Sequence, residues 1–273
     1  MTAPPTQWII DPNHPTERHA VEAVPTALLS GFAVYTTLLG TLTLDWQACH
    51  LQRLADNANA IGIRWEFNHN ELSAHIQAVH TAEHPIVRLT AYPVSMTDNT
   101  GFCLISIRPI PQKKNANGLT LQRIDFCRPL PMIKWMNLGE LLYFRHQAGT
   151  QGFDDIVLTN SMAHITELST ASFFAWDDTG QLWTPSPERD GCLPGITAKL
   201  VQHCCRELAI PVRQDKPLSI HDVKHWQAAF SSNAVSGVQA IAGINRQDLP
   251  WPPWYRDQFC RLQGELKKAG FLE

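Results

Sequence analysis

The stretch Ile133-Lys134-Trp135-Met136-Asn137 is the starting point for predicting the fold of this chain. It places one lysine among apolar neighbours. An amine in such surroundings loses its proton more readily than a solvated amine, as covalent chemistry on a carbonyl group requires. A lysine in an apolar run is, however, more often a surface side chain with a buried stem. The interpretation therefore depends on signals elsewhere in the chain.

Three further signals accompany this lysine. Arg53 lies in His50-Leu51-Gln52-Arg53-Leu54, within a predicted helix, and a guanidinium suits a phosphate. Glu167 lies on a predicted strand, where a carboxylate could keep a pyridine nitrogen protonated. Gly195-Ile196-Thr197 opens a predicted helix whose free N–H groups could bind a phosphate dianion. Each signal alone fits an exposed side chain or an ordinary helix start, but together they predict a pyridoxal-phosphate site.

The order and spacing of these motifs resemble the class IV (fold-type IV) pyridoxal-phosphate aminotransferase superfamily over roughly residues 30 to 245. The resemblance implies an α/β chain that is like D-amino-acid aminotransferase, with a small α+β domain and a larger mixed α/β domain. It also implies pyridoxal 5'-phosphate as the cofactor. Lys134 would hold that cofactor and act as the catalytic residue, Glu167 would contact its pyridine nitrogen, and the phosphate would be held by Arg53, Ile196 and Thr197.

Three local motifs are similar to the 4-amino-4-deoxychorismate lyases of this superfamily. Tyr35-Thr36-Thr37 looks like their Phe-Thr-Thr, and Lys134-Trp135-Met136-Asn137 looks like their Lys-x-Leu-Asn. Ser232-Asn233-Ala234 looks like their Cys-Asn-Ala. The resemblance implies a lyase that converts 4-amino-4-deoxychorismate to 4-aminobenzoate and pyruvate, a step of folate biosynthesis.

The same resemblance assigns further site residues. Asn233 would donate or accept hydrogen bonds on the phosphate or substrate side, and Thr37 and Asn137 would contact the substrate. Two positions depart from the lyase pattern: Leu138 stands where an arginine is common, and Ser172 stands where an asparagine is usual. The alternatives are an aminotransferase that acts on D- or branched-chain amino acids, and a decayed, non-catalytic family member.

Composition excludes several other classes of protein. The net charge is −3 and no lysine- or arginine-rich block occurs, so we expect no nucleic-acid partner. No apolar run approaches the roughly 20 residues that span a bilayer, and the seven cysteines include no Cys-x-x-Cys pair. We therefore expect a cytoplasmic enzyme with a small-molecule substrate, and the family resemblance implies a homodimer.

Two histidine pairs at i, i+4 spacing are the only sequence hints of a metal site. His80 and His84 form one pair, and His221 and His225 form the other. Neither pair has a carboxylate or cysteine spaced to complete a tetrahedral site, so we expect no metal ion.

Hydrophobic periodicity predicts two domains, residues 1–115 and 116–273. The boundary lies in the segment 109–118, which follows neither the helical nor the strand pattern of apolar residues. The first would be a small α/β domain and the second a larger domain that carries the cofactor lysine. Residues 1–30 are expected to be irregular. Strands are predicted at 34–39, 86–92, 102–107, 119–124, 156–159, 163–167 and 172–176, and helices at 45–61, 70–80, 138–148, 195–208 and 254–269.

Overall fold

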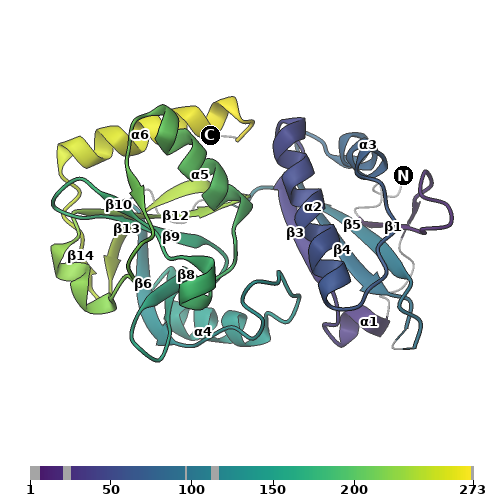
Figure 1. Ribbon diagram of the computed structural model, residues 1–273, viewed down its shortest axis with the longest axis horizontal. Coiled ribbons are helices and arrows are strands. Elements are labelled where there is room, and N and C mark those ends of the chain that lie inside the picture. The colour runs from purple at the N-terminus through teal and green to yellow at the C-terminus, as the bar shows by residue number, and fades with distance from the viewer. Residues whose placement is uncertain (1–6, 21–25, 96, 112–116, 272–273) are drawn as a thin grey trace. The chain divides into compact units, whose positions relative to one another are not determined.

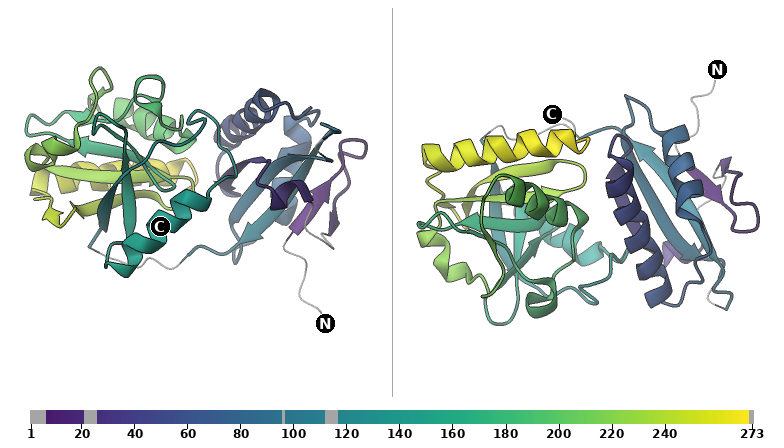
Figure 2. Two further views of the ribbon diagram at one scale, coloured as in Figure 1. Left: turned by 90° about the horizontal axis from the view of Figure 1, so that it is seen from below. Right: turned by 45° about the horizontal axis from the view of Figure 1, so that its top comes forward.

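The computed structural model describes residues 7–20, 26–95, 97–111 and 117–271 (Figures 1 and 2). The chain divides into two units, each described here by itself. Unit 1 comprises Met1–Pro111 and Ile133–Asn137, and unit 2 comprises Gln112–Met132 and Leu138–Glu273. The predicted boundary between residues 115 and 116 lies outside the described residues.

Unit 1 is built on an antiparallel sheet with the strand order β2-β1-β5-β4-β3. Its long strands are the predicted ones, because runs of β-branched and apolar residues favour extended structure. The two short strands lie in a region expected to be irregular, and that expectation was wrong because pairing with β5 stabilises a segment whose own pattern is weak. The strands are β1 (Gln7–Ile10), β2 (His19–Ala20), β3 (Val34–Leu39), β4 (Ile86–Pro93) and β5 (Gly101–Arg108).

Two helices cover one face of this sheet (Figure 1). They are α2 (Leu44–Ala60) and α3 (His69–Val79), and a single turn, α1 (Thr26–Leu29), precedes β3. The apolar residues of α2 and α3 recur every three to four positions and are buried, as the sequence predicts. Burial of this stripe holds α2 against β3 and so fixes where its polar side chains point.

The segment Ile133–Asn137 belongs to unit 1 because its backbone pairs with the start of that unit's β3. Trp135 forms an antiparallel bridge with Val34. The Tyr35 N–H donates to the Lys134 carbonyl at 3.0 Å. The lysine therefore does not group with unit 2, which differs from the prediction of a second domain that carries it, because long-range backbone pairing outweighs its place in the sequence.

Unit 2 contains a mixed sheet with the order β11-β10-β9-β12-β13-β6-β7-β8, and β14 pairs with β13. β6 and β7 are parallel neighbours, and the connection between them contains helix α4 (Gly139–Thr150), since parallel strands need a long crossover connection. The strands are β6 (Leu119–Asp125), β7 (Asp155–Thr159), β8 (Ile165–Leu168), β9 (Ser172–Trp176), β10 (Leu182–Trp183), β11 (Val212–Arg213), β12 (Ala228–Asn233), β13 (Gly237–Ile244) and β14 (Gln247–Asp248).

The helices of unit 2 are α4 (Gly139–Thr150), α5 (Ile196–Glu207) and α6 (Pro253–Lys268), and α5 and α6 lie side by side (Figures 1 and 2). A π-helical turn covers Pro187–Gly191 and a 3₁₀ helix covers Ile220–His225. All three predicted helices are confirmed within two residues at their ends. Strands β12 and β13 were not predicted, because their many Ala, Ser and Gly residues carry little β-propensity.

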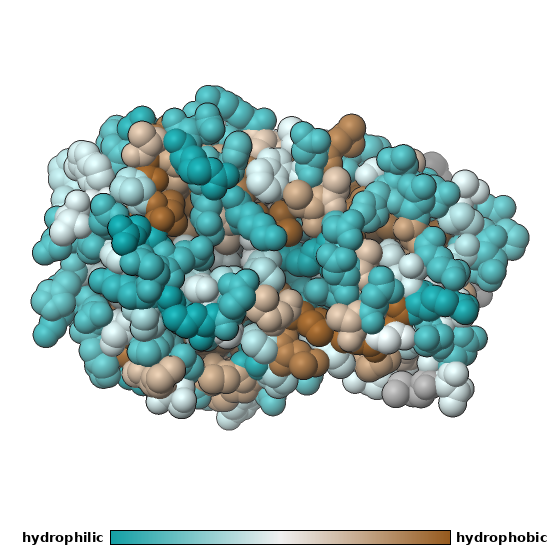
Figure 3. Space-filling view, in the orientation of Figure 1, coloured by the Kyte–Doolittle hydropathy of each residue, from teal (hydrophilic) through white to brown (hydrophobic). Residues whose placement is uncertain are grey.

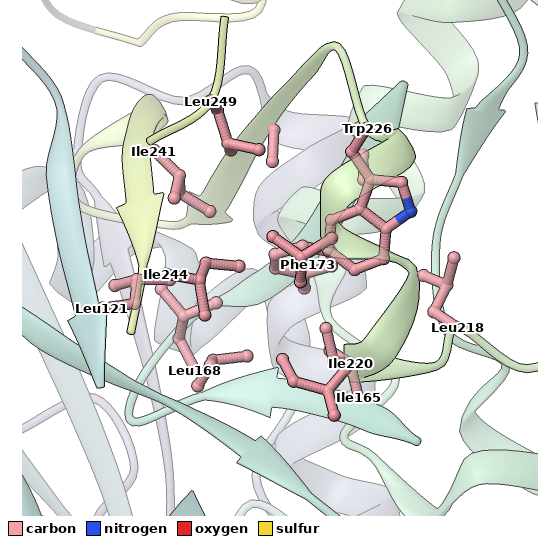
Figure 4. Packing of buried hydrophobic residues seen from close by; sticks show 14 of the residues in the cluster. Leu121, Ile165, Leu168, Phe173, Leu218, Ile220, Trp226, Ile241, Ile244 and Leu249 are labelled. Atoms are coloured by element: carbon pink, nitrogen blue, oxygen red, sulfur yellow. The ribbon is translucent and has the colours of Figure 1, made fainter. Parts of the chain in front are cut away.

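A large buried cluster of apolar side chains in unit 2 includes residues of β8 and β9 (Figure 4). Ile165 and Leu168 both belong to it, although an odd spacing would send them to opposite faces of a regular strand. An irregularity in the β7–β8 pairing resolves this, since Val157 pairs with Leu168 while Thr159 pairs with Ile165. The extra residue in β8 is a β-bulge, a feature that redirects side chains.

The outer surface visible in Figure 3 is mainly hydrophilic, with hydrophobic patches scattered over it. Within the described ranges, no helix combines the length and the apolar character needed to cross a membrane.

Candidate functional site

Lys134 is fixed through its backbone. Its N–H donates to Asn57 Oδ1 at 2.8 Å, from the last turns of α2, and its carbonyl accepts from Tyr35 in β3. The next turn of the segment is held by the Met136 N–H, which donates to the Ala33 carbonyl at 2.9 Å. The lysine backbone is thus held by both the sheet and the helix of unit 1.

The Lys134 side chain lies against an aromatic ring that also contacts a second cation. Its Nζ is 4.7 Å from the centroid of the Tyr35 ring, and the Arg88 guanidinium is 4.6 Å from the same centroid. The Arg88 Nε also donates to Thr37 Oγ1 at 3.2 Å. Cations attract the face of an aromatic ring, so Tyr35 gives both side chains a defined position. Of the residues predicted as substrate contacts, Thr37 is therefore brought to the same face as Lys134.

A second arginine, Arg108, lies on the face of the sheet that carries Tyr35 and Arg88. Arg88 pairs with Ser106, and Ile86, two residues before Arg88, pairs with Arg108. Directly opposed residues share a face, as do residues two apart, so Arg88 and Arg108 project on the same side. Burial and the positive charge of Arg88 lower the pKa of Arg108. In the described residues neither arginine forms an ion pair with a carboxylate, so the two positive charges on this face could bind an anion.

Arg53, the predicted phosphate ligand, is half-buried on α2 and touches β3. Its Nη2 donates to Thr36 Oγ1 at 3.2 Å. Thr36 Oγ1 lies 2.8 Å from His50 Nδ1, and both Thr36 and His50 are buried. Burial, followed by the positive charges of Arg53 and Lys134, lowers the pKa of His50 well below its ordinary value. His50 is therefore neutral near pH 7.

Glu167 in unit 2 is buried and paired with a cation. The Arg128 Nη1 lies 3.2 Å from Glu167 Oε1 and 3.3 Å from Oε2, and the two side chains are 10% and 7% exposed. Glu167 lies in the bulged part of β8, away from its core-facing neighbours Ile165 and Leu168. The ion pair stabilises the carboxylate form, the form that would hold a proton on a pyridine nitrogen.

The other predicted phosphate residues of unit 2 lie at the start of α5. Gly195 is its N-cap and supplies no side-chain cap, so the first N–H groups of the helix, including those of Ile196 and Thr197, are available to an anion. A Cβ on Gly195 would lie 2.7 Å from Ser172 Oγ, so glycine keeps this approach open. Ser172, noted as a departure from the lyase pattern, thus packs against Gly195 at the start of α5.

The hydroxyl of Ser232, from the Ser232-Asn233-Ala234 motif, is buried without a hydrogen-bond partner in the described residues. Ser232 is 2% exposed. Ser232 pairs directly with Ser172 across β12 and β9. Because a buried, unsatisfied hydroxyl costs about 1–3 kcal/mol, the site fits a phosphate group that would accept from it.

The contacts of three further residues do not point to a cofactor or a substrate. These residues are Asn233, Asn137 and Leu138. Asn233 Oδ1 accepts from Val235 N–H at 2.9 Å and from Ser236 N–H at 2.8 Å, so its carbonyl closes the β12–β13 turn. Asn137 is exposed. Leu138 is partly buried and packs against the apolar cluster that includes Leu141 and Ala148 of α4. The roles of Asn233 and Asn137 stay predictions.

The histidine pairs differ from the i, i+4 helical arrangement that their spacing suggests. Helix α3 ends at Val79, so His80 is its C-cap and His84 lies in the following loop. His221 and His225 lie on an exposed 3₁₀ helix. No group of three His, Cys, Asp or Glu side chains suited to a metal occurs in the part of the chain that is described.

Sequence reasoning assigned no role to five polar residues near these sites, which are His50, Arg88, Arg108, Arg128 and Ser232. Arg88 carried a usable signal, since it interrupts the apolar run of β4 at a single position. His50 precedes Arg53 by three residues and so lies on the same helix face. Arg128 and Arg108 carried no comparable local signal.

Comparisons with known proteins place the chain in a family. Residues 46–244 match the model of amino-transferase class IV, so the chain belongs to the class IV aminotransferase family. A curated relative from Rickettsia typhi, named "Probable branched-chain-amino-acid aminotransferase", is 23% identical over 235 residues, which cover 80% of this chain and 78% of that protein.

Two solved structures share the fold. One from Legionella pneumophila, named "Putative 4-amino-4-deoxychorismate lyase", has a TM-score of 0.79 and 20% identity, covering 92% of this chain and 96% of that one. An aminotransferase from Brucella abortus bound to the cofactor PLP also has a TM-score of 0.79 and 20% identity, covering 97% and 99%. The predicted α/β architecture of fold-type IV is confirmed.

Proposed function

We propose that this chain is a pyridoxal-phosphate-dependent lyase that converts 4-amino-4-deoxychorismate to 4-aminobenzoate and pyruvate. The observation that carries the proposal is the pair Arg88 and Arg108 on the face that holds Tyr35 and Lys134. The lyase substrate has two carboxylates, whereas a branched-chain amino acid has one carboxylate and an apolar side chain. Two cationic side chains that form no ion pair with a carboxylate in the described residues suit the first substrate better than the second.

The cofactor is pyridoxal 5'-phosphate, as in the Brucella abortus structure of this fold. Lys134 would hold it covalently, Glu167 would face its pyridine nitrogen, and Arg53, Ile196, Thr197 and Asn233 would hold its phosphate. The unsatisfied Ser232 Oγ supports the phosphate assignment. When bound, the cofactor supplies an electron sink for the pair released at the amine-bearing carbon of the substrate.

Lys134 would move the protons of the reaction. Its amine would take the proton from the amine-bearing ring carbon, and the bond between the ring and the enolpyruvyl oxygen would then break. The departing enol carbon would take a proton back, from Lys134, to give pyruvate, while the ring becomes aromatic. Arg88 and Arg108 would orient the carboxylates, with Thr37 beside them, and orientation is the main demand of a downhill step.

An aminotransferase that acts on D- or branched-chain amino acids is the second candidate, favoured by the name of the Rickettsia typhi relative. It would use the same lysine, glutamate and phosphate ligands. The two candidates differ in the substrate that the cationic face of Arg88 and Arg108 must bind, and they can be separated by their products alone.

The deciding experiment incubates the cofactor-loaded protein with 4-amino-4-deoxychorismate and follows 4-aminobenzoate and pyruvate. Equal amounts of both products are the expected result. No product, together with keto-acid formation from D- or branched-chain amino acids, would replace the proposal with the aminotransferase. Failure to bind the cofactor would point to the non-catalytic family member.

A further inference from the structure

His50 is buried on α2, three residues before Arg53, and both side chains meet the same hydroxyl. Thr36 Oγ1 lies 2.8 Å from His50 Nδ1 and receives a hydrogen bond from Arg53 Nη2 at 3.2 Å. Thr36 is fully buried, and within the described part of the chain these are the two hydrogen-bond partners of its hydroxyl. The direction of both bonds can be worked out from this set.

Arginine has five N–H donors and no acceptor, so Arg53 donates and Thr36 Oγ1 accepts. The hydroxyl proton of Thr36 then has a single acceptor within reach, His50 Nδ1. His50 Nδ1 must therefore be unprotonated, with the ring proton on Nε2. The tautomer of His50 follows from the donor inventory of its neighbours.

We propose that His50 is a positioning residue for Arg53, acting through a directed chain of hydrogen bonds from Arg53 to Thr36 to His50. These hydrogen bonds orient the Thr36 lone pairs toward the guanidinium and so hold one Nη of Arg53 against β3. The inference rests on the proposed function, in which Arg53 holds the cofactor phosphate.

Two features of the site support this role over a purely structural one. His50 contacts the sheet by a polar bond at a position where the neighbouring Leu51 and Leu54 already supply apolar packing. Its neutral state is also maintained by burial and by the charges of Arg53 and Lys134. A protonated His50 would lose its acceptor, and Thr36 would have to turn away from the ring.

The test compares the affinity of the protein for pyridoxal 5'-phosphate with its affinity for pyridoxal, which lacks the phosphate. Thr36→Val and His50→Leu remove the relay. Thr36→Ser keeps the hydroxyl, and His50→Asn keeps an acceptor oxygen at the place of Nδ1. We expect the first two variants to lose on the order of tenfold in pyridoxal-phosphate affinity with pyridoxal affinity unchanged, and the second two to regain most of it.

A preference for the phosphate that is unchanged in folded Thr36→Val would overturn the positioning role alone. Equal losses for both ligands would also overturn it, by showing a general structural effect. If the wild-type protein binds neither ligand, the proposed function is wrong, and this inference, which rests on it, is wrong as well.

A second measurement is independent of the cofactor. The ¹⁵N chemical shifts of the His50 ring should show Nδ1 unprotonated and Nε2 protonated near pH 7. A protonated Nδ1 would contradict the relay directly.

Discussion

The Arg128 guanidinium lies 3.2 Å from the Glu167 carboxylate, and both side chains are almost completely buried in unit 2. Removing one partner of such a pair leaves a buried charge without its counter-ion. We expect Arg128→Gln to lower the free energy of unfolding by about 3–5 kcal/mol, as measured by chemical denaturation. The matched control is Lys268→Gln, which breaks the exposed pair with Glu265 and should cost less than about 1 kcal/mol. Similar losses in both variants would contradict this account.

Lys134→Ala should abolish turnover and the absorbance of the bound cofactor together, because one amine serves both covalent attachment and proton transfer. The backbone hydrogen bonds of Lys134 with Asn57 and Tyr35 would remain, so we expect the loss of its side-chain contact with the Tyr35 ring to shift the unfolding transition only a little. Lys224→Ala, on the 3₁₀ helix, is the control. Turnover retained by Lys134→Ala would remove this residue from the mechanism.

Arg88→Gln and Arg108→Gln should each raise the KM for a dicarboxylate substrate by about 10- to 100-fold, the range expected when a charged hydrogen bond to an anion is lost. Arg64→Gln offers a comparison, because Arg64 is exposed and already paired with Glu66. Steady-state kinetics provide the measurement. An unchanged KM in both variants would leave the cationic face of Arg88 and Arg108 without a role in substrate binding.

Ser232→Ala should have opposite effects on the apo and loaded protein. The apo protein should gain stability, up to about 1–3 kcal/mol, because a buried hydroxyl without a partner in the described residues is removed. Its affinity for pyridoxal 5'-phosphate should fall, because the donor to the phosphate is lost. Thermal unfolding with and without the cofactor measures both effects. A variant less stable in both states would show that the hydroxyl has a partner within the fold.

The buried His50 predicts an acid dependence of stability. Its pKa is lowered in the folded state, so the unfolded chain takes up the proton first, and stability falls as the pH drops below about 6.5. The contribution is fully present above that pH. His50→Asn should remove this part of the acid sensitivity, which unfolding curves at pH 7.5 and pH 5 would reveal. Identical pH profiles in the two proteins would mean that the pKa of His50 is the same in the folded and unfolded states.

The sequence was informative where a single element carries the signal. The strand Val34–Leu39, the helix around Arg53 and the helix start at Ile196 all follow from local periodicity and were placed correctly. The sites also depend on partners that periodicity does not reveal. Arg128 reaches Glu167 over 39 residues of chain, and Arg53 reaches Thr36 over 17. Such pairs are set by strand order and register, which a single sequence does not encode in a local pattern.

Strands β12 and β13 show a second limit. Their small residues are poor strand formers, yet both strands lie inside the sheet of unit 2, between β9 and β6. Burial on both faces selects small side chains at close contacts and overrides intrinsic propensity. Ser232 and Asn233 lie on β12, so the burial of the Ser232 hydroxyl could not be foreseen without that strand.

The path of the chain through Ile133–Asn137 limits how this protein can be divided or recombined. The polypeptide enters unit 2, returns for five residues to pair with β3, and then continues into α4 of unit 2. A fragment that ends at Pro111 would keep Arg53 and Asn57 but lack the lysine, and a fragment that begins at Leu119 would carry the lysine without its backbone partners. Neither unit can therefore be exchanged with a relative as a self-sufficient module, and mutations on β3 and around the lysine are expected to be inherited as one co-adapted set.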